Sequence, residues 1–432
     1  MVGDMITAMI DCLPRMLELV QAYPRSPRLE LTGHLKEEFA KAGVCSKITP
    51  GMRIAVGVGS RGITNLSEIV KTVLGILEDA GAKPFLLPAM GSHGGATPDG
   101  QQKVLAEYGI TPAAMGVPFE TSMEVEEIGR TPWGDPVVFS APALKADGVV
   151  VINRIKPHTD FYCDLGSGLQ KMLAIGFGKH VGAINTHAAA SRVGHEVAIR
   201  ETAKVILGKV PVLCGVALLE DQHHKTAKVR VIQAPDIPAQ EAQLLVEARS
   251  LMPRLPFDEM DLLIVDQIGK EISGTGMDTN VIGRGVFGYI SSLQSVSALK
   301  PHISRIFVRD LSAATNGNGI GIGLADFTTT RAVKALNLNY VYTNALTSLG
   351  LPCAKIPMYF DTDREVIAKA IDSLAAASPE KVRIVRITDT LNLDRLLISE
   401  PLAELARGRA DLEVVGAAKE IEFDGAGNLL PF

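Results

Sequence analysis

Apolar residues recur along this chain at two spacings, and segments of the two kinds alternate. Runs of consecutive apolar residues predict buried strands at 53–59, 84–90, 148–155, 212–219, 229–234, 262–267, 305–308, 340–343 and 383–387. Apolar residues three and four positions apart predict helices at 66–80, 98–108, 196–207, 238–251 and 363–376. Such alternation is typical of mostly parallel sheets covered by helices. We therefore expect an α/β fold.

A break in the pattern predicts a domain boundary in the second half of the chain. Met252-Pro253-Arg254-Leu255-Pro256 follows a predicted helix, and a new buried strand begins a few residues later. The length of 432 residues fits two or three domains. We expect an N-terminal α/β domain over residues 1–255 and a C-terminal α/β domain over residues 256–432.

The composition of the chain argues against several kinds of binding partner and metal site. The chain has 43 basic and 48 acidic residues, a net charge of −5, and no basic run, which argues against nucleic-acid binding. Its five cysteines form no CxxC pair and are odd in number, so neither a disulfide framework nor a thiolate zinc site is expected.

The longest uncharged stretch of the chain, 335–354, contains Asn, Gly and Pro and does not suit a membrane span. The N-terminal residues include two aspartates and do not resemble a signal peptide. We expect a cytoplasmic protein without a membrane partner.

Polar residues follow four of the predicted strands. They are Arg61, His93 in GSHGGAT, His158 in KPHTDF, and the pair Gln267 and Lys270 in DQIGK. In α/β folds, ligands bind where parallel strands end, so these residues are candidates for one site. Imidazole titrates near neutral pH, which suits His93 and His158 to acid/base work. A guanidinium on a tight loop suits Arg61 to bidentate capture of a carboxylate or phosphate.

A small-residue loop, Gly166-Ser167-Gly168, precedes Lys171. Successive backbone N–H groups in such a loop can form a nest for an anion. Lys171 is then a phosphate partner, a point of covalent attachment, or a plain surface lysine. His187 lies further on in an alanine-rich helix without an HExxH motif, where a histidine is more often packed than ligating.

The segment Gly57-Val58-Gly59-Ser60-Arg61-Gly62 matches the GxGxxG pattern of dinucleotide-binding turns. The next predicted strand ends in Pro88-Ala89-Met90-Gly91, without the acidic residue that holds a ribose hydroxyl. NAD binding is therefore the weaker interpretation.

Taken in order, the motifs GSHGGAT, KPHTDF, GSGLQKMLAIG, NTH and DQIGK resemble those of the nickel-pincer-nucleotide-dependent lactate racemase family. The resemblance implies two α/β lobes with the active site in a cleft between them. It implies a nickel ion held by a pyridinium-derived nucleotide through two sulfurs and a carbon, with one histidine completing a square plane, a geometry that suits Ni(II).

Carried onto this sequence, the resemblance implies a role for each candidate residue. His187 would bind nickel, Lys171 would tether the cofactor in the Gly166-Ser167-Gly168 loop, and His93 and His158 would be the paired acid/base groups. The residues that hold the substrate would be Arg61, Gln267 and Lys270. The activity would be inversion of a 2-hydroxy acid by hydride transfer to the cofactor.

Two features leave the substrate and the class of function open. The Arg61 loop reads Val-Gly-Ser-Arg-Gly where the family has Asp-x-Thr-Arg-Pro, and the segment after His158 carries Asp160, Cys163 and Asp164. Lactate and a larger or more polar hydroxy acid are both compatible with these residues. An NAD-dependent 2-hydroxyacid dehydrogenase and a non-catalytic small-acid-binding protein are the alternatives, although a mere binder needs neither Lys171 nor His187.

Overall fold

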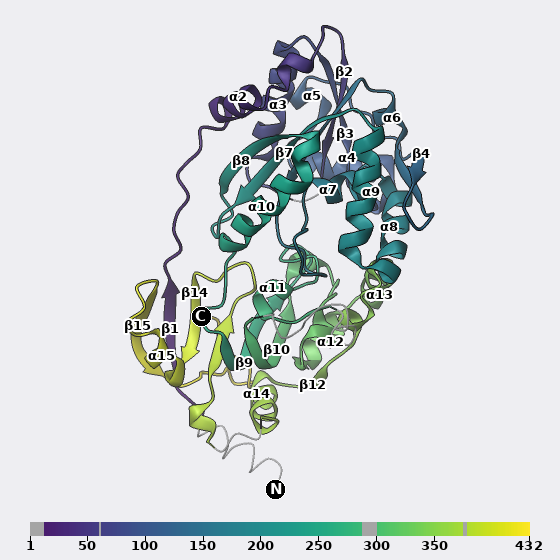
Figure 1. The fold of residues 1–432 in the computed structure, drawn as a ribbon. Coiled ribbons are helices and arrows are strands. Elements are labelled where there is room, and N and C mark those ends of the chain that lie inside the picture. The colour runs from purple at the N-terminus through teal and green to yellow at the C-terminus, as the bar shows by residue number, and fades with distance from the viewer. Residues whose placement is uncertain (1–12, 60–61, 287–299, 375–377) are drawn as a thin grey trace. The chain divides into compact units, whose positions relative to one another are not determined.

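The computed structural model describes residues 13–59, 62–286, 300–374 and 378–432. The chain divides into two compact units, one of residues 25–252 and one that joins the N-terminal residues through Pro24 to residues 253–432. Each unit is a mixed α/β structure with a largely parallel sheet, so the predicted fold class is confirmed (Figure 1).

The first unit, residues 25–252, is built on a five-stranded sheet of order β3-β2-β6-β7-β8. The strands are β2 (Arg53–Val58), β3 (Lys83–Pro88), β6 (Gly148–Arg154), β7 (Val212–Glu220) and β8 (Thr226–Gln233). The first four are parallel and β8 is antiparallel to β7. Their carboxyl ends therefore meet at one edge, where polar loops follow β2, β3 and β6.

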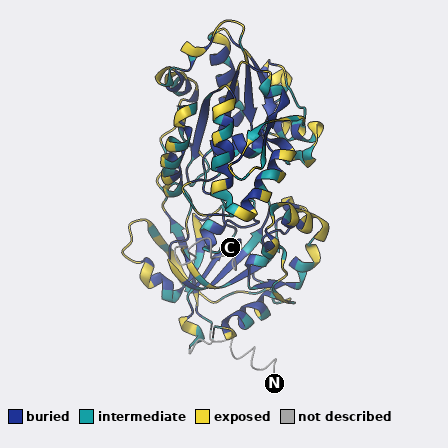
Figure 2. Cartoon of the chain, turned by 45° about the vertical axis from the view of Figure 1, so that its right-hand side comes forward, coloured by how far each residue is buried: buried dark blue, intermediate teal, exposed yellow. Residues whose placement is uncertain are grey.

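Alternating residues of this sheet pack into two apolar cores. Ile54 and Val56 face one core with α2 (Leu31–Ala42) and α3 (Leu66–Asp79). Ala55 and Val151 face the other, against α7 (Leu169–Lys171), η3 (Met172–Gly176), α9 (His195–Lys209) and α10 (Ile237–Ser250). Figure 2 shows the result, with buried strands between helices that are exposed on their outer sides. Both faces of β2 and β6 are covered, which explains their uninterrupted apolar runs.

The remaining elements of the first unit surround this framework. A two-stranded hairpin, β4 (Val125–Arg130) and β5 (Pro136–Ser140), packs on α8 (Lys179–Val193) and α9. The other helices are η1 (Cys45–Lys47), η2 (Gly94–Ala96), α4 (Pro98–Glu107), α5 (Pro112–Met115), α6 (Ala141–Leu144) and η4 (Ala234–Asp236). Thr97 caps α4 by accepting the N–H of Gly100, with Pro98 at the first helical position, as the sequence signal predicts.

The second unit contains an eight-stranded sheet of order β12-β11-β10-β9-β13-β14-β1-β15. The strands are β1 (Met16–Gln21), β9 (Glu259–Ile268), β10 (His302–Leu311), β11 (Phe327–Thr329), β12 (Met358–Phe360), β13 (Ile384–Ile387), β14 (Arg395–Ser399) and β15 (Leu412–Lys419). The five from β12 to β13 are parallel, and the other three continue the sheet in antiparallel fashion.

Helices cover this sheet too. They are α11 (Thr279–Ile282), η7 (Ala313–Thr315), η8 (Ile322–Leu324), α12 (Thr330–Ala335), α13 (Leu338–Ser348), η9 (Leu351–Ala354), α14 (Asp363–Asp372), η10 (Pro379–Lys381) and α15 (Glu400–Ala406). The buried Asp363 accepts hydrogen bonds from Arg309, Arg331 and the backbone N–H of Leu429. These bonds hold the C-terminal residues against α14.

Two sequence predictions are wrong. The N-terminal residues do not belong with the first unit, because β1 pairs with β14 on one side and β15 on the other. The strand predicted at 340–343 is helix α13, which Asn337 caps by accepting the N–H of Tyr340. Tyr340, Val341 and Tyr342 have high strand propensity, but only Val341 is buried, and one buried face suffices for a helix. Within the described residues, no helix is long and apolar enough to cross a membrane.

The placement of β1 predicts which part of the protein responds to a core substitution there. Leu19 is fully buried in the core of the second unit. Leu19→Ala should destabilise that unit by about 2–5 kcal/mol, the usual effect of removing a buried leucine side chain. Hydrogen exchange should accelerate in β14 and β15 and stay unchanged in β2 and β3. Leu35→Ala, at an equally buried site of the first unit, is the matched control and should give the opposite pattern.

Candidate functional site

The loop after β6 is closed at its base by two backbone hydrogen bonds. Lys156 N–H donates to the Ser167 carbonyl, and Ser167 N–H donates to the Lys156 carbonyl, each at 2.8 Å. Gly166 lies so close to this bridge that a Cβ there would be 2.3 Å from the Lys156 carbonyl oxygen. The bridge brings the residues after β6 back to the start of α7, so His158 and Lys171 become neighbours although thirteen positions separate them.

His158 is held from both ring nitrogens. The backbone N–H of Asp160 donates to Nδ1 at 3.0 Å, and Nε2 faces the Lys171 amine. A neutral imidazole that accepts at Nδ1 carries its proton on Nε2. Nε2 of His158 and Nζ of Lys171 are therefore hydrogen-bonding neighbours.

An aromatic stack extends from His158 into the unit. The His158 ring stacks on the ring of buried Phe161, with the ring centroids 4.3 Å apart. The Phe161 ring stacks in turn on the His195 ring, with a centroid distance of 5.0 Å. His195 meets His187 edge to face at 6.2 Å. Four rings therefore connect His158 to His187, two residues that the motifs suggested separately.

His195 is the site residue that sequence reasoning missed. It is the first residue of α9, immediately after the corner that α8 and α9 make at Gly194. Gly194 has φ +83° and ψ 155°, a conformation that is essentially restricted to glycine. This glycine returns the chain so that His195 lies opposite His187. The only signal in the sequence was a glycine next to a histidine at the end of a helix, which is too common to be specific.

His187 lies on α8 with its Nδ1 buried and without a hydrogen-bond partner in the described part of the chain. The pKa of His187 is lowered to about 4, mainly by burial and also by the nearby Lys171 and His195, while Asp160 acts in the opposite direction. Burial also lowers the pKa of His195. His187 is therefore neutral near pH 7 and has an unpaired ring nitrogen, as a metal-binding histidine must.

His93 belongs to the loop after β3, and its side chain is exposed. The loop is tied to the segment that follows Lys171, because Gly91 N–H donates to the Gly176 carbonyl at 3.2 Å. Gln101 secures it further by donating to the carbonyls of Gly91 and His93. Met172–Gly176 is a π-helical turn, a form that is frequent at functional sites.

The small residues before Lys171 do not form the open anion nest that the sequence suggested. Ser167 N–H is already bonded to Lys156, and a Cβ at Gly168 would be 2.1 Å from Oε1 of Glu241. Close packing thus explains both glycines, and a role of Gly166, Ser167 and Gly168 in cofactor binding stays a prediction.

None of the predicted substrate-binding residues belongs to the described part of the first unit. Arg61 lies outside the described residues. Gln267 and Lys270 belong to the second unit, at the carboxyl end of β9. There Gln267 donates to Asp389 at 3.3 Å, and Lys270 Nζ donates to the Gly274 carbonyl at 2.7 Å. The predicted cleft between the lobes likewise stays a prediction.

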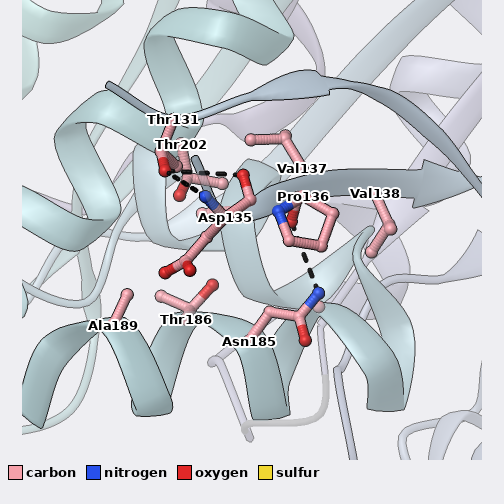
Figure 3. Close-up of a pocket in the computed structure, with 11 residues that line it drawn as sticks. Thr131, Asp135, Pro136, Val137, Val138, Asn185, Thr186, Ala189 and Thr202 are labelled. Carbon is pink, nitrogen blue, oxygen red and sulfur yellow. Dashed lines mark hydrogen bonds between the residues drawn. The ribbon is translucent and has the colours of Figure 1, made fainter. Parts of the chain in front are cut away.

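Two other features of the first unit give no alternative site. A Cβ at Gly57 would be 2.1 Å from the Phe177 ring, so close packing explains the first glycine of the GxGxxG match. The cavity in Figure 3 lies between the β4–β5 turn and the α8 and α9 helices, with Thr131, Asp135 and Thr186 in its wall. Its open space of about 10 Å³ has room for about one water molecule.

The residues present fit a metal held mostly by a cofactor rather than by the protein. Among the described residues, no three His, Cys, Asp or Glu side chains are grouped so that they could hold a metal ion. One neutral histidine, His187, is nevertheless available in the same cluster as an amine, Lys171. This is the donor set expected if the protein supplies a single metal ligand and an attachment point.

Comparison with known proteins gives a family match for the part of the chain that carries this cluster. Residues 26–197 match the family model of the lactate racemase N-terminal domain. This part of the chain is therefore lactate racemase-like, and the family resemblance expected from its motifs is confirmed.

Two solved structures match over most of the length of the chain at low sequence identity. The lactate racemase apoprotein from Thermoanaerobacterium thermosaccharolyticum is 13% identical, with a TM-score of 0.49 over 87% of this chain and 98% of that chain. A protein from Thermotoga maritima is 14% identical, with a TM-score of 0.46 over 77% of this chain and 83% of that chain. No curated protein sequence matches the chain.

The lowered pKa of His187 predicts a pH dependence for the metal-free protein. Between the unfolded pKa of 6.5 and the folded pKa of about 4, the unfolded chain binds a proton that the folded protein does not. The wild type should therefore lose stability relative to His187→Asn as the pH falls through this range, by up to about 3 kcal/mol. Above pH 7 the difference between the two proteins should be constant. Urea unfolding at a series of pH values measures it, and parallel curves from pH 7 to 4 would contradict the burial of a neutral His187.

Proposed function

We propose that this protein is a racemase or epimerase that inverts the hydroxyl-bearing carbon of a 2-hydroxy acid with the help of a nickel-pincer nucleotide. The observation that carries the proposal is the cluster of His158, Lys171 and His187 in the domain that matches lactate racemase. Lys171 faces the His158 imidazole, and His187 is neutral near pH 7 with an unpaired ring nitrogen.

In this proposal Lys171 tethers the cofactor, and His187 is the single protein ligand of its nickel. When bound, the cofactor supplies a hydride acceptor, so that no carbanion has to form beside the substrate carboxylate. The ring contacts from His158 through Phe161 and His195 to His187 link the tether's neighbour to the metal ligand. Gly166, Ser167 and Gly168 would lie against the cofactor near its attachment point.

His158 and His93 have matched roles in inversion. One imidazole takes the hydroxyl proton as the carbon becomes planar, and the other returns a proton to the oxygen after hydrogen is delivered to the opposite face. The two histidines follow different strands, β6 and β3, and the Gly91–Gly176 bond ties the His93 loop to the η3 turn that follows Lys171. Arg61 and Lys270 would hold the substrate carboxylate, and Gln267 would order the site around it.

Nickel retention tests the assignment of His187. In protein produced together with the enzymes that make the cofactor, His187→Ala should retain less than about a tenth of the wild-type nickel, since the only protein ligand is lost. His180→Ala is the matched control, because His180 is exposed on the same helix, and its nickel content should be that of the wild type. Elemental analysis after gel filtration gives both values. Wild-type nickel in His187→Ala would refute the assignment.

The fate of a deuterium label tests the reaction itself. An enantiopure 2-hydroxy acid deuterated at Cα should be inverted in ordinary water with the label retained at Cα, because hydride transfer does not exchange with solvent. Proton NMR follows the label, and chiral chromatography follows inversion. Inversion with loss of the label indicates proton abstraction and contradicts the proposal. Turnover that requires added NAD would instead support a dehydrogenase.

A further inference from the structure

One face of α10 contacts the segment that carries His158 and Lys171. Glu241, Leu245 and Arg249 are four residues apart and therefore lie on the same side of the helix. Arg249 donates to the Cys163 carbonyl and lies over the Tyr162 ring at 4.5 Å. Leu245 leaves no room for a side chain at Gly166, since its Cδ1 would be 2.8 Å from a Cβ there. These contacts of α10 therefore lie along the segment between His158 and Lys171.

Glu241 makes the contact nearest to Lys171. It is fully buried, and its Oε2 accepts the backbone N–H of Gln170 at 2.9 Å. Its Oε1 is buried, has no hydrogen-bond partner among the described residues, and lies where a Cβ of Gly168 would be. Asn153 of β6, which is half-buried, donates to the Gly168 carbonyl at 2.9 Å. The backbone immediately before Lys171 is thus held by the side chains of Glu241 and Asn153.

We propose that Glu241 is a positioning residue for Lys171, because its buried carboxyl group holds the Gly168–Gln170 turn and so keeps the Lys171 amine against His158. Burying a carboxyl group costs free energy of folding unless the group forms hydrogen bonds. The buried position of Glu241 therefore calls for a structural role. The apolar alternative, a leucine, would fill the space and leave Gln170 N–H without this acceptor. The proposal rests on the proposed role of Lys171 as the tether.

The acceptor role does not depend on the charge of Glu241. Burial raises the pKa of Glu241 to about 7, whereas the Gln170 N–H and Arg200 of α9 act to lower it. The ionised and the neutral forms both present an oxygen that accepts from Gln170. A glutamine at this position retains such an oxygen, and an alanine does not.

The experiment measures the accessibility of Lys171 in the protein without cofactor. A small acetylating reagent is applied to the folded protein, and peptide mass spectrometry gives the acetylation rate of Lys171 relative to exposed Lys36. Glu241→Ala should raise this ratio about fivefold, the effect of losing one hydrogen bond that closes the segment. Glu241→Gln should stay within about twofold of the wild type, because its amide oxygen restores the bond.

Two controls separate positioning from general stability. Glu247→Gln removes a carboxylate from the same helix, one that pairs with Lys228, and should leave the Lys171 ratio unchanged. Thermal unfolding of each variant shows whether it is folded at the temperature of labelling. In the Glu241→Ala protein, adding Gly168→Ala should be tolerated, since the oxygen that would clash is gone, whereas Gly168→Ala alone should destabilise the protein.

An unchanged acetylation rate of Lys171 relative to Lys36 in Glu241→Ala overturns the proposal. A Glu241→Gln variant in which this relative rate rises as much as in Glu241→Ala also overturns it. The readout involves neither nickel nor turnover. A failure of the racemase assignment therefore appears in the metal and label experiments, and a failure of this inference appears in the acetylation rates.

Discussion

The pair of hydrogen bonds between Lys156 and Ser167 is the constraint on which the rest of the site depends. Without it, the loop that carries His158 and the turn that carries Lys171 would be separate extensions of the sheet. With it, the loop is closed at its base, and its glycine packs against the bridge without room for a side chain. The first contact of the site, His158 with Lys171, follows from this closure, and α10 then packs along the closed segment.

Burial sets the chemistry of the groups that the closure brings together. His187 and His195 have lowered pKa values chiefly because they are buried. Lys171, if charged, adds repulsion to both, while Asp160 favours their charged forms. A site with an amine and several imidazoles in little space is most stable when most of these groups are neutral. A neutral imidazole nitrogen is the form that binds metals, so the electrostatics of this cluster suit the proposed cofactor.

The framework of the fold could be predicted from the sequence, because buried parallel strands have uninterrupted apolar runs. β2, β3, β6, β7 and β9 all lie within a few residues of the predicted ranges. The strands β1, β14 and β15, at one end of the second unit's sheet, could not be found in this way, since they are antiparallel and the outermost, β15, is largely exposed. The pattern at α13 predicts a strand because tyrosines favour strands in general, although both tyrosines of this helix are exposed here.

The site was predictable only in part, for a related reason. His93, His158, Lys171 and His187 lie in motifs, and motifs are visible in a sequence. His195 depends on a glycine corner between two helices, and Glu241 is one carboxylate in an ordinary amphipathic helix. Such residues become recognisable only when the fold brings distant segments together.

The measurement that tests the account most directly is peptide mapping of the protein made together with the cofactor-producing enzymes. The account predicts one nucleotide-sized adduct per chain, located on Lys171 and absent from the neighbouring buried Lys179, with nickel present in equal amount. Lys171→Arg should abolish the adduct while the protein remains folded. An unmodified Lys171 in protein that nevertheless inverts a 2-hydroxy acid would contradict it.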